Sequence, residues 1–155
     1  MIRHIDVHAV LQQSVSGVYA DLVTRPTGRV VRERIERAIS DPSGGGAWGD
    51  GGEGVVARMD FRGVGCIDYS CADEIVAKLL RGRHVVLVLS GIGDGHREAI
   101  EPVLTGHGLA AVVERPDGTL DIIGAPGAAA ALLQDLVARR LAARTAEGAF
   151  ALTLA

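Results

Sequence analysis

The sequence predicts one α/β domain in which a mixed β-sheet, opened by an N-terminal hairpin, carries helices packed on it. Three observations lead to this class. Short apolar or alternating runs typical of strands take turns along the chain with segments whose apolar residues recur at helical spacing. The length of 155 residues matches a single domain over residues 1–155. Apolar residues make up 48% of the chain and aromatic residues only 3%, so one aliphatic core is expected.

The first predicted elements are two strands and a helix. Residues 3–10 alternate polar and apolar side chains, as in a half-buried strand, and residues 18–23 return as its hairpin partner. A helix follows over residues 29–39. Its buried side is expected to consist of Val30, Val31, Ile35 and Ala38. The glycine-rich stretch 40–54 is predicted to be a loop within the domain, and its Trp48 is either a surface tip or an exposed anchor for a partner.

Residues 55–80 form the central predicted unit, a buried strand followed by a tight loop with two glycines and then a helix. Ser70 stands where a helix N-cap is expected, and Asp73 three residues later is close to a capping box. Asp73 and Glu74 fall in the first turn, where the helix dipole favours a carboxylate. The predicted buried positions recur at helical spacing: Ala72, Ile75, Val76, Leu79 and Leu80.

The rest of the chain continues the alternation of strands and helices. The pattern predicts a buried strand over 84–89, a helix over 96–106, a hairpin over 108–123 with its turn at 115–118, a helix over 128–144 and a short terminal strand over 149–154. The apolar face of the helix over 128–144 runs from Leu132 to Leu141. We expect it either to pack on the sheet or to form the seam of a homodimer.

Composition argues against several classes of partner. The formal net charge is −3 and no basic block occurs, so binding to nucleic acid is not expected. No apolar run approaches the roughly 18 residues that a membrane helix needs, and the N-terminus lacks the pattern of a signal peptide. The two cysteines are too few for a disulfide scaffold. The sequence therefore predicts a cytoplasmic protein without nucleic-acid or membrane partners.

Four short strings of residues give the chain a resemblance to a known superfamily. They are Leu22-Val23-Thr24-Arg25, Gly28-Arg29-Val30-Val31-Arg32, Asp60-Phe61-Arg62-Gly63-Val64 and Ile67-Asp68-Tyr69-Ser70-Cys71-Ala72-Asp73-Glu74. With the order of elements, they resemble the STAS superfamily of sulfate transporter and anti-sigma factor antagonist domains. The likeness is greatest to bacterial STAS-like domains of unknown function that occur with histidine-kinase-like ATPases. It covers about residues 4–115, and the hairpin return and C-terminal helix in 116–155 are unmatched.

The resemblance implies a non-enzymatic signal-transduction module that binds a protein and is switched by phosphorylation. The acceptor position falls on Ser70 and the neighbouring acid on Asp68, and the implied partner is a histidine-kinase-like ATPase or an anti-sigma factor. Tyr69 stands where a small residue is usual, and Cys71 where glycine or phenylalanine is common. The implied partner-binding loop comprises Asp68, Tyr69, Cys71, Asp73 and Glu74. From the residues alone, Ser70 is equally an N-cap without a switching role.

A ligand-sensing module is the first alternative. The stretch Ser90-Gly91-Ile92-Gly93-Asp94 follows a strand and precedes a helix, as phosphate-binding loops do. It lacks both the GxGxxG pattern and the lysine of a Walker loop, so it is equally a plain connection capped by Asp94. The weak candidates for a small-molecule or nucleotide site are Ser90, Gly91, Gly93 and Asp94.

A metal-dependent hydrolase is the second alternative. His4, Asp6 and His8 would project from one face of the strand predicted over 3–10, but no further ligands follow in a matching motif. Cys66 and Cys71 bracket the central loop, and a redox or nucleophilic role would require a thiol with a lowered pKa and a positioned base. The sequence completes no metal or cofactor motif, so neither a metal nor a cofactor is predicted.

Overall fold

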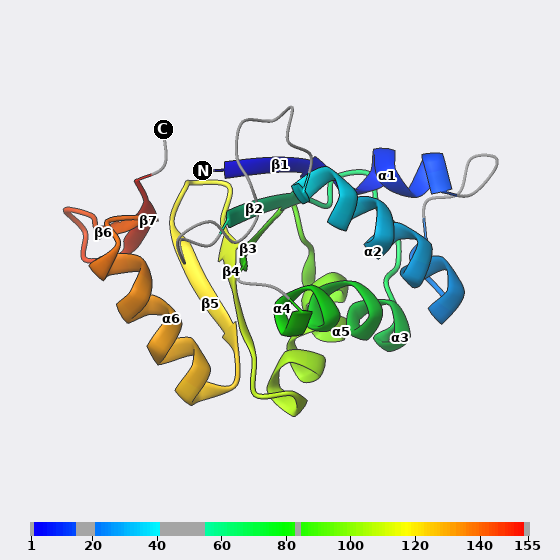
Figure 1. Ribbon diagram of the computed structural model, residues 1–155. Helices are drawn as coiled ribbons and strands as arrows, with labels where there is room; N and C mark the ends of the chain where they lie inside the picture. The colour runs from blue at the N-terminus through cyan, green and yellow to red at the C-terminus, as the bar shows by residue number, and fades with distance from the viewer. Residues whose placement is uncertain (1, 15–20, 41–54, 83–84, 154–155) are drawn as a thin grey trace.

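The computed structural model describes residues 2–14, 21–40, 55–82 and 85–153, which build a central sheet with helices on both faces (Figure 1). The strands are β1 (Ile2–Asp6), β2 (Val55–Asp60), β3 (Val85–Ser90), β4 (Ala110–Glu114), β5 (Leu120–Gly124), β6 (Ala142–Arg144) and β7 (Phe150–Leu152). The helices are α1 (Val7–Ser14), α2 (Arg25–Ser40), α3 (Tyr69–Ala72), the π-helical η2 (Asp73–Ala77), α4 (Lys78–Gly82), α5 (Asp94–Gly106) and α6 (Pro126–Ala138).

The main sheet has five strands in the order β1-β2-β3-β4-β5. The first four run parallel to one another, and β5 runs antiparallel to β4. A short antiparallel pair, β6 and β7, forms a second sheet. The mixed sheet and the alternation of strands with helices confirm the predicted α/β class.

Two apolar clusters lie on opposite faces of the main sheet. The larger cluster joins residues such as Met59 and Leu89 to helices α1, α2, α5 and the continuous helix formed by α3, η2 and α4. The smaller cluster joins Val56, Val88 and Val112 to Leu136 of α6 and to the β6–β7 pair. Figure 1 shows the same layers, with α6 on the side of the sheet opposite α2. None of the described helices combines the length and the apolar character needed to cross a bilayer.

The predicted N-terminal hairpin is wrong. Strand β1 ends at Asp6 and pairs in parallel with β2, and helix α1 begins at the next residue. Val7 and Leu11 lie four positions apart and are both fully buried, which is the spacing of a helix face. Of the predicted second strand, residues 18–20 lie outside the described residues, and Leu22 forms a single parallel bridge with Ile67 instead of pairing with β1.

The central β–loop–α unit is confirmed, but its helix is capped by a different residue. The N-cap is Asp68, whose side chain accepts a hydrogen bond from the backbone N–H of Cys71, and Ser70 is the second residue of α3. Helix α2 begins at Arg25, earlier than predicted. Its buried side includes Val31 and Ile35 as expected, but Val30 is 40% exposed, Ala38 is exposed, and Ile39 takes the buried place.

The C-terminal part keeps the predicted order with a shorter helix. The hairpin of β4 and β5 is confirmed, and β7 lies within the predicted terminal strand. Helix α6 ends at Ala138 instead of continuing to residue 144, because Arg140 takes a left-handed φ of 59° and the chain then enters β6. On α6, Leu136 packs on the sheet while Val137 remains 44% exposed. Trp48 lies outside the described residues.

Replacing Gly124 by alanine should destabilise the fold strongly. Gly124 has a φ of +124°, and a Cβ there would collide with the carbonyl oxygen of Leu109. We expect the free energy of unfolding in urea to fall by about 2–4 kcal/mol. Gly127→Ala in α6 is the matched control, because its added Cβ would meet no heavy atom within 4 Å beyond its chain neighbours and the backbone of its own helix. Equal stability of the two variants would contradict the geometry given for Gly124.

Candidate functional site

Ser70 lies half-buried at the start of the helix that follows β2. Its Oγ donates a hydrogen bond to Oδ1 of Asp68 at 2.8 Å, and the same oxygen accepts from the backbone N–H of Cys71 at 2.8 Å. The hydroxyl is therefore held by the carboxylate that caps the helix. Ser70 supports the cap, and the capping role predicted for it belongs to Asp68.

The Asp68 carboxylate also binds a distant part of the chain. Its Oδ2 accepts from the backbone N–H of Thr24 at 3.1 Å, and the thiol of Cys71 donates to the Thr24 carbonyl at 3.0 Å. Thr24 has a φ of 71°, in the left-handed region that a β-branched residue rarely adopts. One carboxylate thus joins the start of α3, the Ser70 hydroxyl and the turn that leads into α2.

The Asp68 carboxylate stays charged while it accepts these hydrogen bonds. Partial burial raises the pKa of its carboxyl, but hydrogen bonds from Cys71, Ser70 and Thr24 outweigh burial and lower the pKa below its ordinary value. The Cys71 thiol shows the opposite effect, because burial, together with the Asp68 charge, raises its pKa to about 12. Cys71 is fully buried and protonated, so it lacks the reactive thiolate that a redox or nucleophilic role requires.

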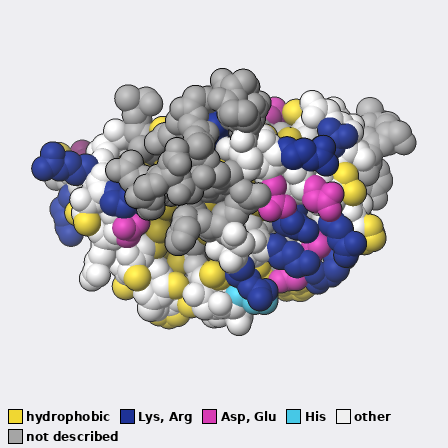
Figure 2. Space-filling model, viewed as in Figure 1, with side chains coloured by type: hydrophobic (Ala, Val, Ile, Leu, Met, Phe, Trp, Pro, Cys, Tyr) yellow, Lys and Arg dark blue, Asp and Glu magenta, His cyan; other side chains and the backbone are white. Residues whose placement is uncertain are grey.

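Glu74 is the one fully buried charged side chain among the described residues. Four cations surround its carboxylate, with nitrogen–oxygen distances of 2.6 Å to Lys78, 3.2 Å to Arg25, 3.5 Å to Arg29 and 3.8 Å to Arg32. Burial raises the pKa of Glu74, but the hydrogen bond and charge of Lys78 and the contacts from the arginines outweigh burial, and the pKa is lowered. Figure 2 shows the resulting concentration of basic side chains on the side of the molecule that carries α2.

A shallow cavity of about 500 Å³ opens beside Ser70. Arg25, Asp73 and His107 line it together with Ser70 and Tyr69, and the Tyr69 residue is 63% exposed. Asp73 binds Arg25 and Nε2 of His107, each at 2.8 Å. Of the predicted partner-binding loop, Tyr69 and Asp73 therefore line an open surface, together with the candidate phosphoacceptor Ser70.

Cys71 and Glu74 of that predicted loop lie beneath the surface, since both are fully buried. The sequence analysis missed Arg25 and His107 as neighbours of Ser70. Arg25 belongs to one of the strings that carried the family resemblance, but nothing in the local pattern shows which carboxylates it reaches.

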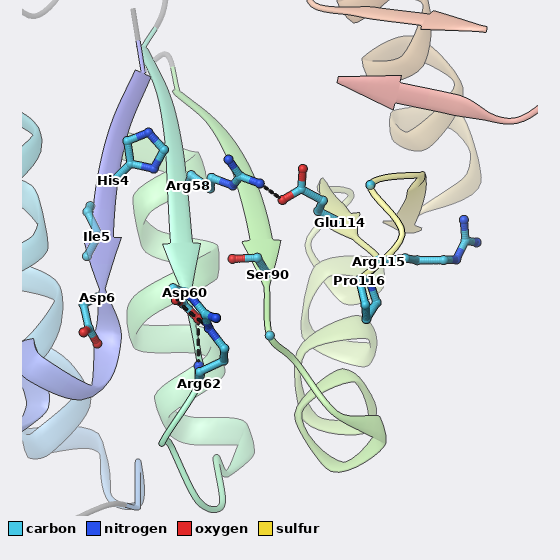
Figure 3. Close-up of a pocket in the computed structure, with 12 residues that line it drawn as sticks. His4, Ile5, Asp6, Arg58, Asp60, Arg62, Ser90, Glu114, Arg115 and Pro116 are labelled. Atoms are coloured by element: carbon cyan, nitrogen blue, oxygen red, sulfur yellow. Dashed lines mark hydrogen bonds and ion pairs between the residues drawn. The ribbon is translucent and has the colours of Figure 1, made fainter. Parts of the chain in front are cut away.

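A second polar constellation lies at the carboxyl ends of the parallel strands. Asp6, Asp60, Ser90 and Glu114 are the last residues of β1, β2, β3 and β4, and strand pairing sets them in register in one row. They line a cavity of about 720 Å³ (Figure 3). Arg58 pairs there with Glu114, and Arg62 pairs with Asp60 at 2.6 Å.

The structure divides the predicted ligand loop. Ser90 and Gly91 line the strand-end cavity. Gly93 instead occupies the N-cap of α5, where its N–H donates to Nδ1 of His96 at 3.0 Å, and Asp94 is the first helical residue. The expectation that Asp94 caps this helix is therefore wrong.

The arrangement expected for a metal hydrolase is also wrong. His4 and Asp6 share a face of β1, but His8 lies on α1, where its Nε2 is 3.3 Å from the Gln12 amide. Among the residues that the structure describes, no three His, Cys, Asp or Glu side chains are grouped as metal ligands.

Comparisons with protein-family models, with curated proteins and with solved structures gave no match for this chain. What bears on function is therefore the geometry of the two constellations and the resemblance carried by the short strings of residues.

Replacing Glu74 by glutamine should lower stability in a pH-dependent way. The variant keeps the shape of the side chain but removes the charge that four cations face, so we expect a loss of about 2 kcal/mol at neutral pH. The folded-state pKa of Glu74 lies below its ordinary value of 4.5, so its contribution is complete above that pH and is lost as pH falls through the folded pKa.

Urea unfolding at several pH values tests this expectation. The difference between the native chain and Glu74→Gln should shrink as pH falls below 4.5, the ordinary pKa of the carboxyl. Glu101→Gln is the control, because Glu101 is 41% exposed and pairs with Arg97 on the surface of α5. A difference that stays constant down to acid pH would show that the Glu74 charge does not stabilise the fold.

Proposed function

We propose that this chain is a non-enzymatic regulatory module of the anti-sigma-factor-antagonist type, which binds a protein partner and is switched by phosphorylation of Ser70. The observation that supports it is the position of the Ser70 hydroxyl. It lies on an open cavity beside exposed Tyr69 and is bonded to the carboxylate that holds the turn before α2.

Phosphorylation would act first on Asp68. A phosphate adds about −1.5 to −2 charge at neutral pH, and on Ser70 it would stand next to a carboxylate that is already ionised. The Ser70 O–H, which now donates to Asp68, would no longer exist. Repulsion between the phosphate and Asp68 would then weaken the hydrogen bond that Asp68 accepts from the Thr24 N–H. Because Thr24 immediately precedes α2, the first turn of α2 would shift as well.

The same cavity offers the phosphate a cation. Arg25 lines it and now binds Asp73 and Glu74, and His107 lines it while bound to Asp73. A phosphoserine would compete with Asp73 for the Arg25 guanidinium, since a dianion binds arginine more strongly than one carboxylate does. Both effects rearrange the surface that carries Tyr69.

The exposed side chains fit a protein-binding surface. Tyrosine and arginine are enriched among the residues that contribute most of the binding energy at protein interfaces. Tyr69 and Arg25 line one cavity here. The proposed partner is a cytoplasmic histidine-kinase-like ATPase or anti-sigma factor, as the resemblance of the Asp60–Val64 and Ile67–Glu74 strings implies. The unmodified form would bind it, and the phosphorylated form would release it.

Phosphorylation is tested with the full chain, ATP and the histidine-kinase-like ATPases of the same organism. We expect mass spectrometry to find one phosphate on Ser70, and no label on Ser70→Ala. Ser90→Ala is the matched control and should be labelled like the native chain, because Ser90 is the last residue of β3 and lies in the strand-end cavity and not in the cavity beside Ser70. Label on any other residue, or none with every ATPase, would contradict the switch.

Binding to the ATPase gives a separate prediction. Ser70→Asp should raise the Kd of the complex by a factor of tens or more, because an unpaired charge buried in an interface costs about 2 kcal/mol or more of binding free energy. Ser70→Ala should keep the affinity, and far-UV circular dichroism should show both variants folded. An unchanged affinity in Ser70→Asp would remove the regulatory role.

A further inference from the structure

The strand-end cavity has no role in the switch at Ser70, and its construction points to a ligand. On the face that packs α6, Val56 and Val86 cover the amino ends of β2 and β3. On the same face, the side chains nearer the carboxyl ends include Arg58 and Asp60 in β2 and Ser90 in β3. The carboxyl ends of parallel strands are where α/β sheets bind ligands.

We propose that the cavity at the carboxyl ends of β1 to β4 binds a small zwitterion of the free amino-acid type. Its volume of about 720 Å³ lies in the range of small-molecule sites. The cavity is lined by three arginines and three carboxylates, which are Arg58, Arg62, Arg115, Asp6, Asp60 and Glu114. These formal charges balance, so a ligand that carries both signs and no net charge leaves no excess charge in the cavity.

The anionic group of the ligand fits beside Ser90. Arg58 donates to Glu114 through Nη2, and Arg62 donates to Asp60 through Nε and Nη2. A guanidinium has five N–H donors in a planar fork, so both arginines keep donors for a carboxylate. Figure 3 shows Ser90 between these two ion pairs, with its hydroxyl pointing toward β2. The three groups together form a binding site for one carboxylate.

The cationic group of the ligand fits at β1. Asp6 is exposed, and among the described residues its carboxylate accepts one hydrogen bond, from the Ala9 N–H at 3.1 Å, and forms no ion pair. It lies directly opposite Asp60 in the strand register. An ammonium group would therefore meet one acid that Arg62 reaches only through space, without an ion pair, and a second acid on the neighbouring strand. This asymmetry sets the ammonium toward β1 and the carboxylate toward β3.

The loop after β3 holds one arginine in place. Gly91 has a φ of +68°, and a Cβ there would lie 2.6 Å from Cγ of Arg62 and 2.9 Å from Oδ1 of Asp60. The Arg62–Asp60 pair therefore rests directly on the Gly91 backbone. Although its side chain is 82% exposed, Arg62 is fixed by several hydrogen bonds to Asp60, one of them at 2.6 Å. A guanidinium fixed in advance loses less conformational freedom when a ligand binds.

Isothermal titration of the full chain with each standard amino acid tests the proposal. We expect at least one to bind with a Kd of about 1 mM or tighter. Arg62→Gln and Asp6→Asn should each weaken that binding at least about tenfold, since each removes one charged contact. Both changes spare the fold, because Arg62 is largely exposed and asparagine caps α1 as well as aspartate does. Thermal unfolding of each variant checks this.

Arg97→Gln is the matched control. Arg97 is an arginine of α5 that pairs with Glu101 and Asp121 and does not line the cavity, so the Kd should stay within about twofold. AMP, inorganic phosphate and spermidine serve as probes of other ligand classes. The proposal is overturned if no amino acid binds at about 10 mM, if only one of these three probes binds, or if Arg62→Gln and Asp6→Asn bind like the native chain.

Discussion

Parallel pairing of the first four strands is the constraint on which the rest of this structure depends. Two parallel strands cannot be joined by a tight turn, so each connection must cross back over the sheet. Here α1 and α2, then α3 to α4, then α5 make those crossings, and all of them pack on the face that holds Met59 and Leu89. The opposite face receives the segments after β5, namely α6 and the β6–β7 pair (Figure 1). These cover it in part, and the carboxyl ends of the strands are left to polar side chains.

The two polar constellations are neighbours along the chain although they open on different parts of the molecule. Asp60 ends β2 in the strand-end cavity, and Asp68 caps α3 beside Ser70. The loop between them is held at several points. The Phe61 N–H donates to the Ser90 carbonyl at 2.9 Å, and Nε2 of His96 lies 2.6 Å from the Gly65 carbonyl oxygen. A short, well-anchored loop therefore links the strand-end cavity to the cavity beside Ser70.

Much of the fold could be predicted from local pattern, because strands and helices with one buried face repeat at known periods. Strands β2 to β5 and helices α2, α5 and α6 follow from such patterns. The N-terminal error shows the limit of this approach. Residues 3–10 alternate well enough for a long strand, but Val7 and Leu11 satisfy a helix equally well. Only the packing of α1 against the rest of the chain distinguishes the two.

The position of Asp68 and Ser70 at a helix start could be predicted, but their contacts could not. Asp68 and Ser70 are both good N-cap residues, and the sequence alone does not rank them. The capping bond from the Cys71 N–H is local, but Asp68 also accepts from the Thr24 N–H, which lies far away in the chain. Glu74 was predicted in the first helical turn and in the partner-binding loop, and nothing in the local pattern indicates that it is buried. Its burial depends on cations from α2, and a local pattern contains no information about them.

The closeness of α2 to the helix that begins at Tyr69 has a mechanical consequence. A Cβ on Gly28 would lie 3.0 Å from Cβ of Glu74 and 3.2 Å from Cα of Cys71, so the two backbones already touch. There is no soft layer of long side chains at this crossing to absorb a small displacement. We therefore expect a small displacement of either helix to be transmitted directly to the other at Gly28.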